Sequence, residues 1–323
     1  MRLAALSTYI PPERIAAEAI VRAAGGSLAE ARVFERMFGL QAVARFPQGR
    51  ALSDLFAPMI PELEAAHDGA PPDTLITVSG LPGSGAETRL NPGDLTARFG
   101  FLRQISHLYR IDQNNCGGVF WALDMARNLL TAGGARSVLV LAGDTHAPLA
   151  LADRYLPGCT LMGDALCGFV LDRKPGGLQV GPIALHSHPE FCFGHAGNSA
   201  QMGRFFRAHG DLVRSALDAV GFDWFGQGAL LPHNVNRFAW QSFARETGLP
   251  ASRIRLGLLP DVGHCYTTDP FLLLAQELSA TPRPPAPLTL VSAGIGGFVG
   301  ACRLTPEASL SLLSSFQIKE TVS

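Results

Sequence analysis

Runs of apolar residues along this chain follow two patterns. Apolar residues at 119, 123, 126 and 130 recur at helical spacing and predict a helix over 119–130. A second helix is predicted over 270–278, where a leucine-rich segment follows Asp269. Short apolar runs bounded by polar residues, glycine or proline predict strands instead. The predicted strands cover residues 74–80, 137–144, 229–234, 288–294 and 298–304, and the first residues, 1–12, predict another.

These elements form two similar units. Cys116 stands 27 residues before Gly143, and His264 stands 30 residues before Gly294. In each unit a strand leads into a polar segment, a helix, a turn and a second strand. The period is far too long for a solenoid repeat. We interpret the pattern as one α/β unit that was duplicated and fused, with functional residues of both halves meeting at the junction.

The length of 323 residues allows one large domain or two intimately packed ones. No low-complexity linker separates the two units. The seam is predicted at residues 172–177, where charged residues, proline and glycine follow one another. This seam divides the chain into an N-terminal half, 1–173, and a C-terminal half, 174–323.

Composition narrows the class of protein. The chain is 47% hydrophobic and 16% charged, with a net charge of −1. It lacks the basic stripe or tail that neutralises phosphates, which argues against nucleic acid as a partner. No apolar run approaches the roughly 20 residues of a membrane span, and the N-terminal run is too short for a signal peptide. The six cysteines have no CxxC spacing, so we expect reduced thiols and a cytoplasmic protein.

Cys116 is the strongest candidate for chemistry. It lies in Asn114-Asn115-Cys116-Gly117-Gly118, immediately before the predicted helix 119–130. Either asparagine is a suitable N-cap, which places Cys116 at or near the helix N-terminus. Unpaired N–H groups and the positive end of the helix dipole stabilise an anion there, so they favour a thiolate. A thiolate in this position predicts a nucleophile that accepts an acyl group.

Four motifs resemble those of the β-ketoacyl-acyl-carrier-protein synthase III family, in order and in rough spacing over nearly the whole chain. They are Asn115-Cys116-Gly117-Gly118, residues 162–168, Pro232-His233-Asn234-Val235-Asn236 and residues 293–300. The resemblance implies the thiolase fold, a five-layer αβαβα sandwich that is usually a homodimer, with residues 91–102 facing the dimer partner. It implies that Cys116 accepts an acyl group from coenzyme A or an acyl carrier protein, in fatty acid or polyketide biosynthesis. It implies no tightly bound cofactor, because the acyl-CoA or phosphopantetheine-linked acyl donor is a substrate.

The chain departs from this family at one place. Family condensing enzymes use a Cys-His-Asn triad, and the family histidine matches His233. The family asparagine matches His264, and Asp269 follows five residues later. A histidine paired with an aspartate beside a cysteine suits acyl transfer to a hydroxyl or amine, as in divergent acyltransferases of secondary metabolism that resemble the family. Decarboxylative condensation instead needs neutral donors around the thioester oxygen, so it is the alternative here. A non-catalytic partner subunit is the alternative from another class.

Several residues have a competing structural interpretation. Asp269-Pro270 is also a common helix start, in which Asp269 would be only a cap. His233 could be a core histidine, and the other five cysteines are typical packing residues. Arg154 lies near the expected coenzyme-binding region but out of register with the family position. Which of His233 and His264 is the main base stays open.

Two further signals concern other ligands. Residues 186–195 gather His186, His188, Cys192 and His195, which are metal-ligand types, but their spacing matches no closed zinc site, and we predict no metal. The glycine run 294–300 follows a strand as a dinucleotide loop does, yet a strand rather than a helix follows it. These glycines more plausibly allow backbone N–H groups to approach the thioester, with the N–H groups of Cys116 and Gly297 as oxyanion donors.

Overall fold

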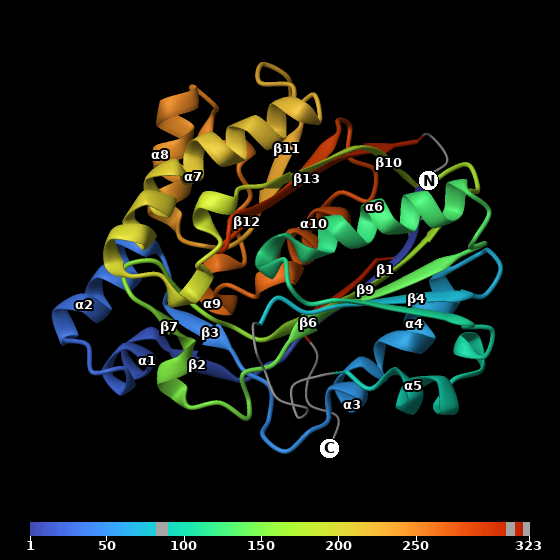
Figure 1. The fold of residues 1–323 in the computed structure, drawn as a ribbon, viewed down its shortest axis with the longest axis horizontal. Helices are drawn as coiled ribbons and strands as arrows, with labels where there is room; N and C mark the ends of the chain where they lie inside the picture. Colours follow the sequence, from blue (N-terminus) through green and yellow to red (C-terminus); the bar gives the residue numbers. More distant parts are fainter. Residues whose placement is uncertain (82–89, 308–313, 319–323) are drawn as a thin grey trace.

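The computed structural model describes residues 1–81, 90–307 and 314–318, and its longer strands join in one mixed sheet (Figure 1). The strand order is β11-β12-β13-β10-β1-β9-β6-β4-β5, with β14 also paired to β1. The strands are β1 (Arg2–Ile10), β4 (Thr74–Val78), β5 (His107–Ile111), β6 (Val138–Asp144), β9 (Ala165–Asp172), β10 (Leu178–Ser187), β11 (Ala229–Pro232), β12 (Leu288–Gly294), β13 (Phe298–Pro306) and β14 (Ser314–Ile318). The six strands predicted from apolar runs are confirmed as β1, β4, β6, β11, β12 and β13, and the two predicted helices as α6 (Gly118–Thr131) and α10 (Asp269–Ala280).

The two halves of the sheet repeat one strand order. The N-terminal half reads β5-β4-β6-β9-β1, and the C-terminal half reads β11-β12-β13-β10. At the position that corresponds to β5, Ile254 makes an isolated parallel bridge to Leu230 of β11. This repetition is what a duplicated unit would produce. The division at residue 173 stays a prediction, and it falls in the turn between β9 and β10, where Gly176 and Gly177 have positive φ.

Each half-sheet is buried on both faces. Successive side chains along a strand point to opposite faces of the sheet, and the side chains on each face pack in a different core. In β6, Val138 and Val140 pack in the core that contains α6 and α10, whereas Leu139 and Leu141 pack in a second core with α3 (Leu52–Phe56), α4 (Met59–Ala66) and α5 (Pro92–Arg98). In the same way, β12 directs Leu290 toward α6 and α10. The next residue, Val291, packs in a third core with α7 (Ser199–Ala219) and α8 (Arg237–Thr247). The layers are therefore α3–α5, N-terminal strands, α6 with α10, C-terminal strands, and α7 with α8, which confirms the predicted five-layer sandwich (Figure 1).

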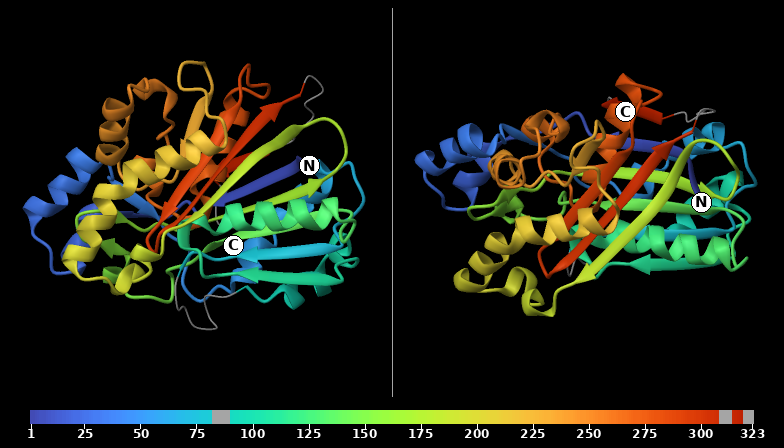
Figure 2. Two further views of the ribbon diagram at one scale, coloured as in Figure 1. Left: turned by 45° about the horizontal axis from the view of Figure 1, so that its top comes forward. Right: turned by 90° about the horizontal axis from the view of Figure 1, so that it is seen from above.

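The half-sheets meet at β1 and β10. These strands share two residue pairs, Arg2 with Gln179 and Leu3 with Leu178, and then separate. Figure 2 shows the strands of the two halves fanning apart from this junction. The strand β14 pairs in parallel with β1 from Leu6 to Ile10 and occupies the opening between the half-sheets.

Shorter elements complete the fold. A small sheet of two strands, β2 and β3, joins α1, α2 and η1 near the N-terminus, and β7 pairs with β8. Among the helices in the described ranges, none has the length and apolar character needed to cross a membrane. The remaining elements are β2 (Arg14–Ala16), α1 (Ala17–Ala23), α2 (Leu28–Val33), η1 (Phe34–Phe38), β3 (Ala42–Ala44), η3 (Gly100–Leu102), η4 (Asn115–Gly117), η5 (Leu151–Arg154), β7 (Tyr155–Leu156), β8 (Thr160–Leu161), η6 (Pro189–Phe191), η7 (Gly194–Ala196), η8 (Ala251–Arg253), α9 (Leu259–Val262) and η9 (Tyr266–Thr268).

Candidate active site

Cys116 lies at the start of the central helical layer. It is the middle residue of the short helix η4, which continues directly into α6, so it occupies the helix N-terminus as predicted. The predicted asparagine cap is wrong, because no side chain caps either helix. Asn115 instead adopts a left-handed backbone conformation (φ 47°), and its amide nitrogen donates to the carbonyl of Gly80 at 3.0 Å. The strained residue before the nucleophile is thus held by the loop that follows β4.

Gly294, at the end of β12, packs closely against the backbone at Asn115 and Cys116. A Cβ at Gly294 would lie 3.0 Å from the backbone nitrogen of Cys116 and 3.0 Å from the Cβ of Asn115. Only glycine fits such a close approach without a shift of the surrounding backbone. The segments after β5 and after β12, which belong to different halves of the chain, therefore meet at Cys116.

His264 links the nucleophile to a buried carboxylate. Its Nε2 lies 3.1 Å from the Sγ of Cys116, and its Nδ1 lies 2.6 Å from the Oδ2 of Asp269. The Sγ also lies 3.0 Å from the Oδ1 of Asn115, so the thiol proton has two possible acceptors. The structure thus brings Cys116, His264 and Asp269 into one continuous chain of hydrogen bonds.

Asp269 is completely buried, and its carboxylate accepts hydrogen bonds from two backbone N–H groups as well as from His264. Its Oδ1 accepts the N–H of Cys265 at 2.8 Å, and its Oδ2 accepts the N–H of Asn234 at 2.7 Å. It is the first residue of α10, and no side chain caps that helix, so the cap interpretation of Asp269 is wrong. The carboxylate orients the His264 ring and also joins the segment after β11 to the segment before α10.

The pKa of His264 reflects two opposing effects. Burial alone would lower it, but the negative charges of the Cys116 thiolate and of Asp269, with the hydrogen bonds to both, raise it to about 10. His264 is therefore placed to take the thiol proton of Cys116 on Nε2 while Asp269 holds its Nδ1–H.

His233 lies beside His264 but points to another partner. The two ring centroids are 6.0 Å apart, and the Nε2 of His233 lies 3.2 Å from the Nε2 of His209 on α7. Burial, with the nearby charges of His209 and His264, holds the pKa of His233 well below its ordinary value, so this ring is neutral. His209 does not stand out in the sequence, because with Phe205 and Leu212 it follows the apolar spacing of a helix and resembles an ordinary core residue.

The predicted oxyanion donor at Gly297 is already bonded. Its N–H donates to the carbonyl of Gly294 at 3.1 Å, and its carbonyl accepts the N–H of His188 at 2.9 Å. Ala293 and Ile295 line the cavity in front of Cys116, and Gly297 does not. The oxyanion role of Gly297 stays a prediction, and it would require this turn to open.

A cavity of about 590 Å³ lies in front of the nucleophile. Cys116, His264, His233 and His209 all contribute to its wall. Most of the other lining side chains are apolar or aromatic; they include Met37, Phe38, Leu156, Met162, Phe205, Phe206, Phe238, Phe243 and Tyr266. The cavity is suited to an organic group that presents one reactive carbonyl at its polar end.

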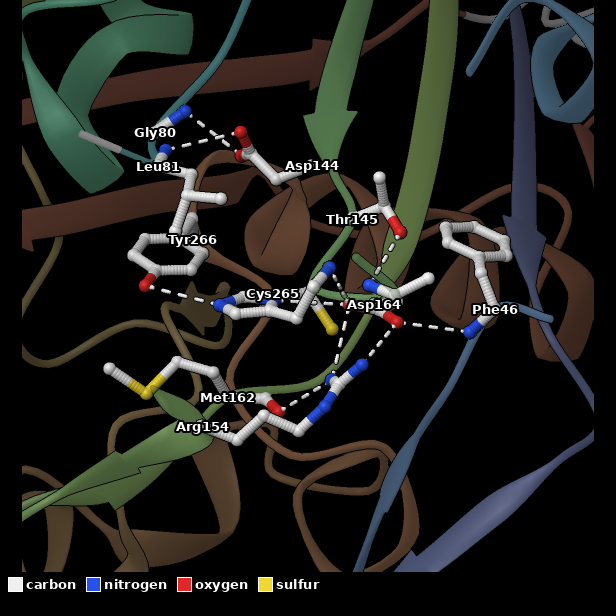
Figure 3. Close-up of polar contacts among 12 residues, drawn as sticks. Phe46, Gly80, Leu81, Asp144, Thr145, Arg154, Met162, Asp164, Cys265 and Tyr266 are labelled. Atoms are coloured by element: carbon white, nitrogen blue, oxygen red, sulfur yellow. Dashed lines mark hydrogen bonds and ion pairs between the residues drawn. The ribbon is translucent and has the colours of Figure 1, made fainter. Parts of the chain in front are cut away.

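A second polar cluster lies under the site and is centred on Asp164 (Figure 3). Arg154 donates to both oxygens of this carboxylate, at 3.1 and 2.7 Å, and the N–H of Phe46 donates at 2.9 Å. His146 donates to Asp164 and lies 3.5 Å from the hydroxyl of Tyr266, which lines the cavity. Arg154 is only 2% exposed, and its guanidinium is bonded to Asp164, so it is no docking residue for a coenzyme.

The absence of a metal from the histidine-rich segment 186–195 stays a prediction. Among the side chains that the structure describes, those that could share an ion are His67, Asp68 and Asp172, far from this segment in the sequence. Arg2 is bonded to both of those carboxylates.

Comparison with known proteins agrees with the fold. The family model for 3-oxoacyl-[acyl-carrier-protein] synthase III matches residues 112–189, which include Cys116. Two proteins named beta-ketoacyl-[acyl-carrier-protein] synthase III are similar: one from Sphingopyxis alaskensis is 28% identical over 51% of this chain and 56% of its own length, and one from Rhizorhabdus wittichii is 25% identical over 57% and 62%. The match thus spans little more than half the length of these relatives.

Solved structures are similar in fold to nearly the whole chain. ChlB3, described as an acyltransferase, superposes with a TM-score of 0.76 at 20% identity and covers 96% of this chain and 98% of its own. The priming β-ketosynthase of the R1128 polyketide biosynthetic pathway superposes with a TM-score of 0.75 at 18% identity, covering 95% and 96%. The chain is therefore similar in part of its sequence to 3-oxoacyl-[acyl-carrier-protein] synthase III proteins, and it shares the fold of these solved structures over nearly its whole length.

Proposed function

We propose that this protein is an acyltransferase that loads an acyl group onto Cys116 and passes it to a hydroxyl or amine. The observation that carries the proposal is the hydrogen-bonded chain from Cys116 through His264 to Asp269. A buried carboxylate behind the imidazole favours a base that takes and returns a proton, as in acyl transfer. The donor is an acyl thioester of coenzyme A or of an acyl carrier protein.

In the first step the Cys116 thiolate attacks the thioester carbonyl. The bond from the acyl carbon to the donor sulfur breaks, and the departing thiolate takes the proton of the His264 imidazolium. In the second step the acceptor O–H or N–H gives its proton to neutral His264 and attacks the acyl carbon. The bond to the Cys116 sulfur then breaks, and the ion pair of Cys116 and His264 is restored.

Acyl loading tests the nucleophile directly. Wild-type protein mixed with an acyl thioester should gain the mass of one acyl group on Cys116, because its Sγ lies 3.1 Å from the Nε2 of His264 and Cys116 lines the cavity. Cys116→Ala should gain none. Cys159, which also lines the cavity, is the internal control, since burial raises the pKa of its thiol and disfavours a nucleophilic anion. Peptide mapping that finds the acyl group on another cysteine, with Cys116 unmodified, would disprove the assignment.

The pH dependence of the second step tests the base. Loading an acyl group removes the negative charge of Cys116, which is the main influence that raises the pKa of His264. The pKa of His264 in the acyl-enzyme should therefore lie below about 10, and transfer to an alcohol should speed up as pH rises through it. The measurement is the decay of isolated acyl-enzyme with an alcohol at a series of pH values. A decay rate that falls as pH rises is incompatible with His264 as the base.

A decarboxylative synthase is the second candidate. The relatives named above are synthases, and neutral His233 is a donor of the kind that stabilises an enolate. In that reaction His264 would do the work of the asparagine that this chain lacks. A non-catalytic subunit is disfavoured, because the pairing of Cys116 with His264 has no role in a subunit that only shapes a complex.

We further propose that the protein is a homodimer. The strand β5 ends the sheet, and its Leu108 is 54% exposed, so this edge suits pairing with a second copy. The predicted dimer-facing segment 91–102 forms α5 and η3, just before β5. Light scattering at micromolar concentration should give twice the monomer mass of 34.3 kDa. A single species of monomer mass would contradict the proposal.

A further inference from the structure

The cavity wall holds two histidines that bond to each other. His209 projects from α7 and is 9% exposed, and His233 is 2% exposed at the end of β11. Their Nε2 atoms lie 3.2 Å apart. Burial lowers the pKa of His209 to about 4, and His233 is also neutral, so neither ring carries a second proton. Two neutral imidazoles bond only when one Nε2 carries a proton and the other does not.

The surrounding backbone shows which ring donates. The N–H of Ala293 points to the Nδ1 of His233 at 3.4 Å, so this nitrogen is an acceptor without a proton. The single proton of neutral His233 is therefore on Nε2. The Nε2 of His209 accepts it, and the proton of His209 is on Nδ1.

Trp240 holds His233 in this position. Its indole N–H donates to the carbonyl of His233 at 3.0 Å, and its ring lies 5.4 Å from the His233 ring and 5.7 Å from the His209 ring. The indole is 1% exposed. Trp240 therefore holds the backbone of His233 and packs against its ring, and His209 supplies the acceptor that fixes the direction of the Nε2–H.

We propose that His209 is a positioning residue that, together with the Ala293 N–H, keeps His233 in its Nε2–H tautomer as a hydrogen-bond donor to the acyl carbonyl. The carbonyl oxygen that enters the cavity then competes with His209 for one preformed donor. In this tautomer the unprotonated nitrogen of His233 is Nδ1, which accepts the N–H of Ala293, so His233 offers no proton acceptor to a molecule in the cavity. His233 and His264 thus have separate roles, donor and base. The kinetic part of this inference rests on the proposed acyl transfer, but the tautomer does not.

The tautomer is measurable in the wild-type protein without turnover. Long-range ¹H–¹⁵N spectra of histidine-labelled protein distinguish protonated from bare ring nitrogens, and His233→Gln and His209→Gln assign the two rings among the nine histidines. We expect a protonated Nε2 and a bare Nδ1 on His233, with the reverse on His209. A protonated Nδ1 on His233 would overturn the proposal.

Two variants then separate positioning from packing. His209→Phe keeps an aromatic ring on α7 but removes the acceptor, so the His233 Nε2–H signal should broaden or disappear, and acyl loading and transfer should slow by up to roughly 10²-fold. His209→Gln keeps an acceptor oxygen and should restore most of both. If both variants retain the wild-type tautomer and rates, or both lose them equally, His209 only packs. If wild type itself transfers no acyl group, the proposed function fails while the tautomer result still stands.

Discussion

Replacing His264 with alanine should slow acyl transfer from Cys116 to the acceptor by roughly 10²–10⁴-fold, the usual contribution of a general base. His264 is the residue whose two ring nitrogens reach both the nucleophile and the buried carboxylate, at 3.1 and 2.6 Å. Its loss leaves the acceptor proton without a base. Donor binding should be largely intact, because the apolar cavity wall is unchanged. The measurement is single-turnover decay of acyl-enzyme, with donor binding followed separately.

Two companion variants sharpen this result. Asp269→Asn should reduce transfer less than His264→Ala, because it disturbs the tautomer of His264 and leaves the base in place. Asp269 also accepts hydrogen bonds from the N–H groups of Cys265 and Asn234, so the free energy of unfolding of the Asp269→Asn variant must be measured as well. His264→Asn restores the condensing triad of the synthase family. Full activity in that variant, with carbon dioxide released, would favour the synthase over the acyltransferase.

The second large effect concerns stability, at Asp164. Replacing it with alanine should lower the free energy of unfolding by about 3–5 kcal/mol, the range found when one partner of a buried ion pair is removed. The side chain is fully buried, and Arg154, which is 2% exposed, would be left without its carboxylate. Burial alone would raise the pKa of Asp164, but the hydrogen bond from His146 and the charge of Arg154 lower it to about 2. Its contribution is therefore present above pH 3.8 and lost as the pH falls toward about 2.

An exposed ion pair of similar geometry provides the matched control. Arg98 and Asp54 are also 2.7 Å apart, but their side chains are 45% and 43% exposed. Asp54→Ala should change the free energy of unfolding by less than about 1 kcal/mol, since water screens the pair and solvates the remaining guanidinium. Urea titration of both variants gives the comparison. Equal losses from the two substitutions would show that burial does not govern the strength of the Asp164 cluster.

Local sequence patterns predicted the elements well, for a physical reason. The strands at 137–144 and 288–294 are buried on both faces, so they are continuous apolar runs, and the buried residues of the helix 119–130 recur at helical spacing. Cys116 is predicted from its place at a helix N-terminus, whereas the roles of His264 and Asp269 are predicted from the resemblance to a family and from the departure from its triad. The layer order itself came from the resemblance to a family rather than from periodicity.

Other features depend on contacts that no local pattern contains. Asn115 fails as a cap because a partner 35 residues away, Gly80, holds it in a left-handed conformation. Gly297 turns its N–H back to Gly294, which depends on the shape of one tight turn. His209 acquires its significance only from His233, 24 residues later in the chain. Each of these arises from pairing between elements that the sequence keeps apart.

The most direct test of the account is the carbon dioxide released per product formed. Acyl-enzyme on Cys116 is given a hydroxyl or amine acceptor in one reaction and a carboxylated acyl thioester, such as a malonyl thioester, in the other. With His264 and Asp269 acting as base and orienting group, the acyl group should appear on the hydroxyl or amine with no carbon dioxide released. One carbon dioxide per product from the malonyl thioester, with no transfer to the other acceptors, would contradict the acyltransferase proposal.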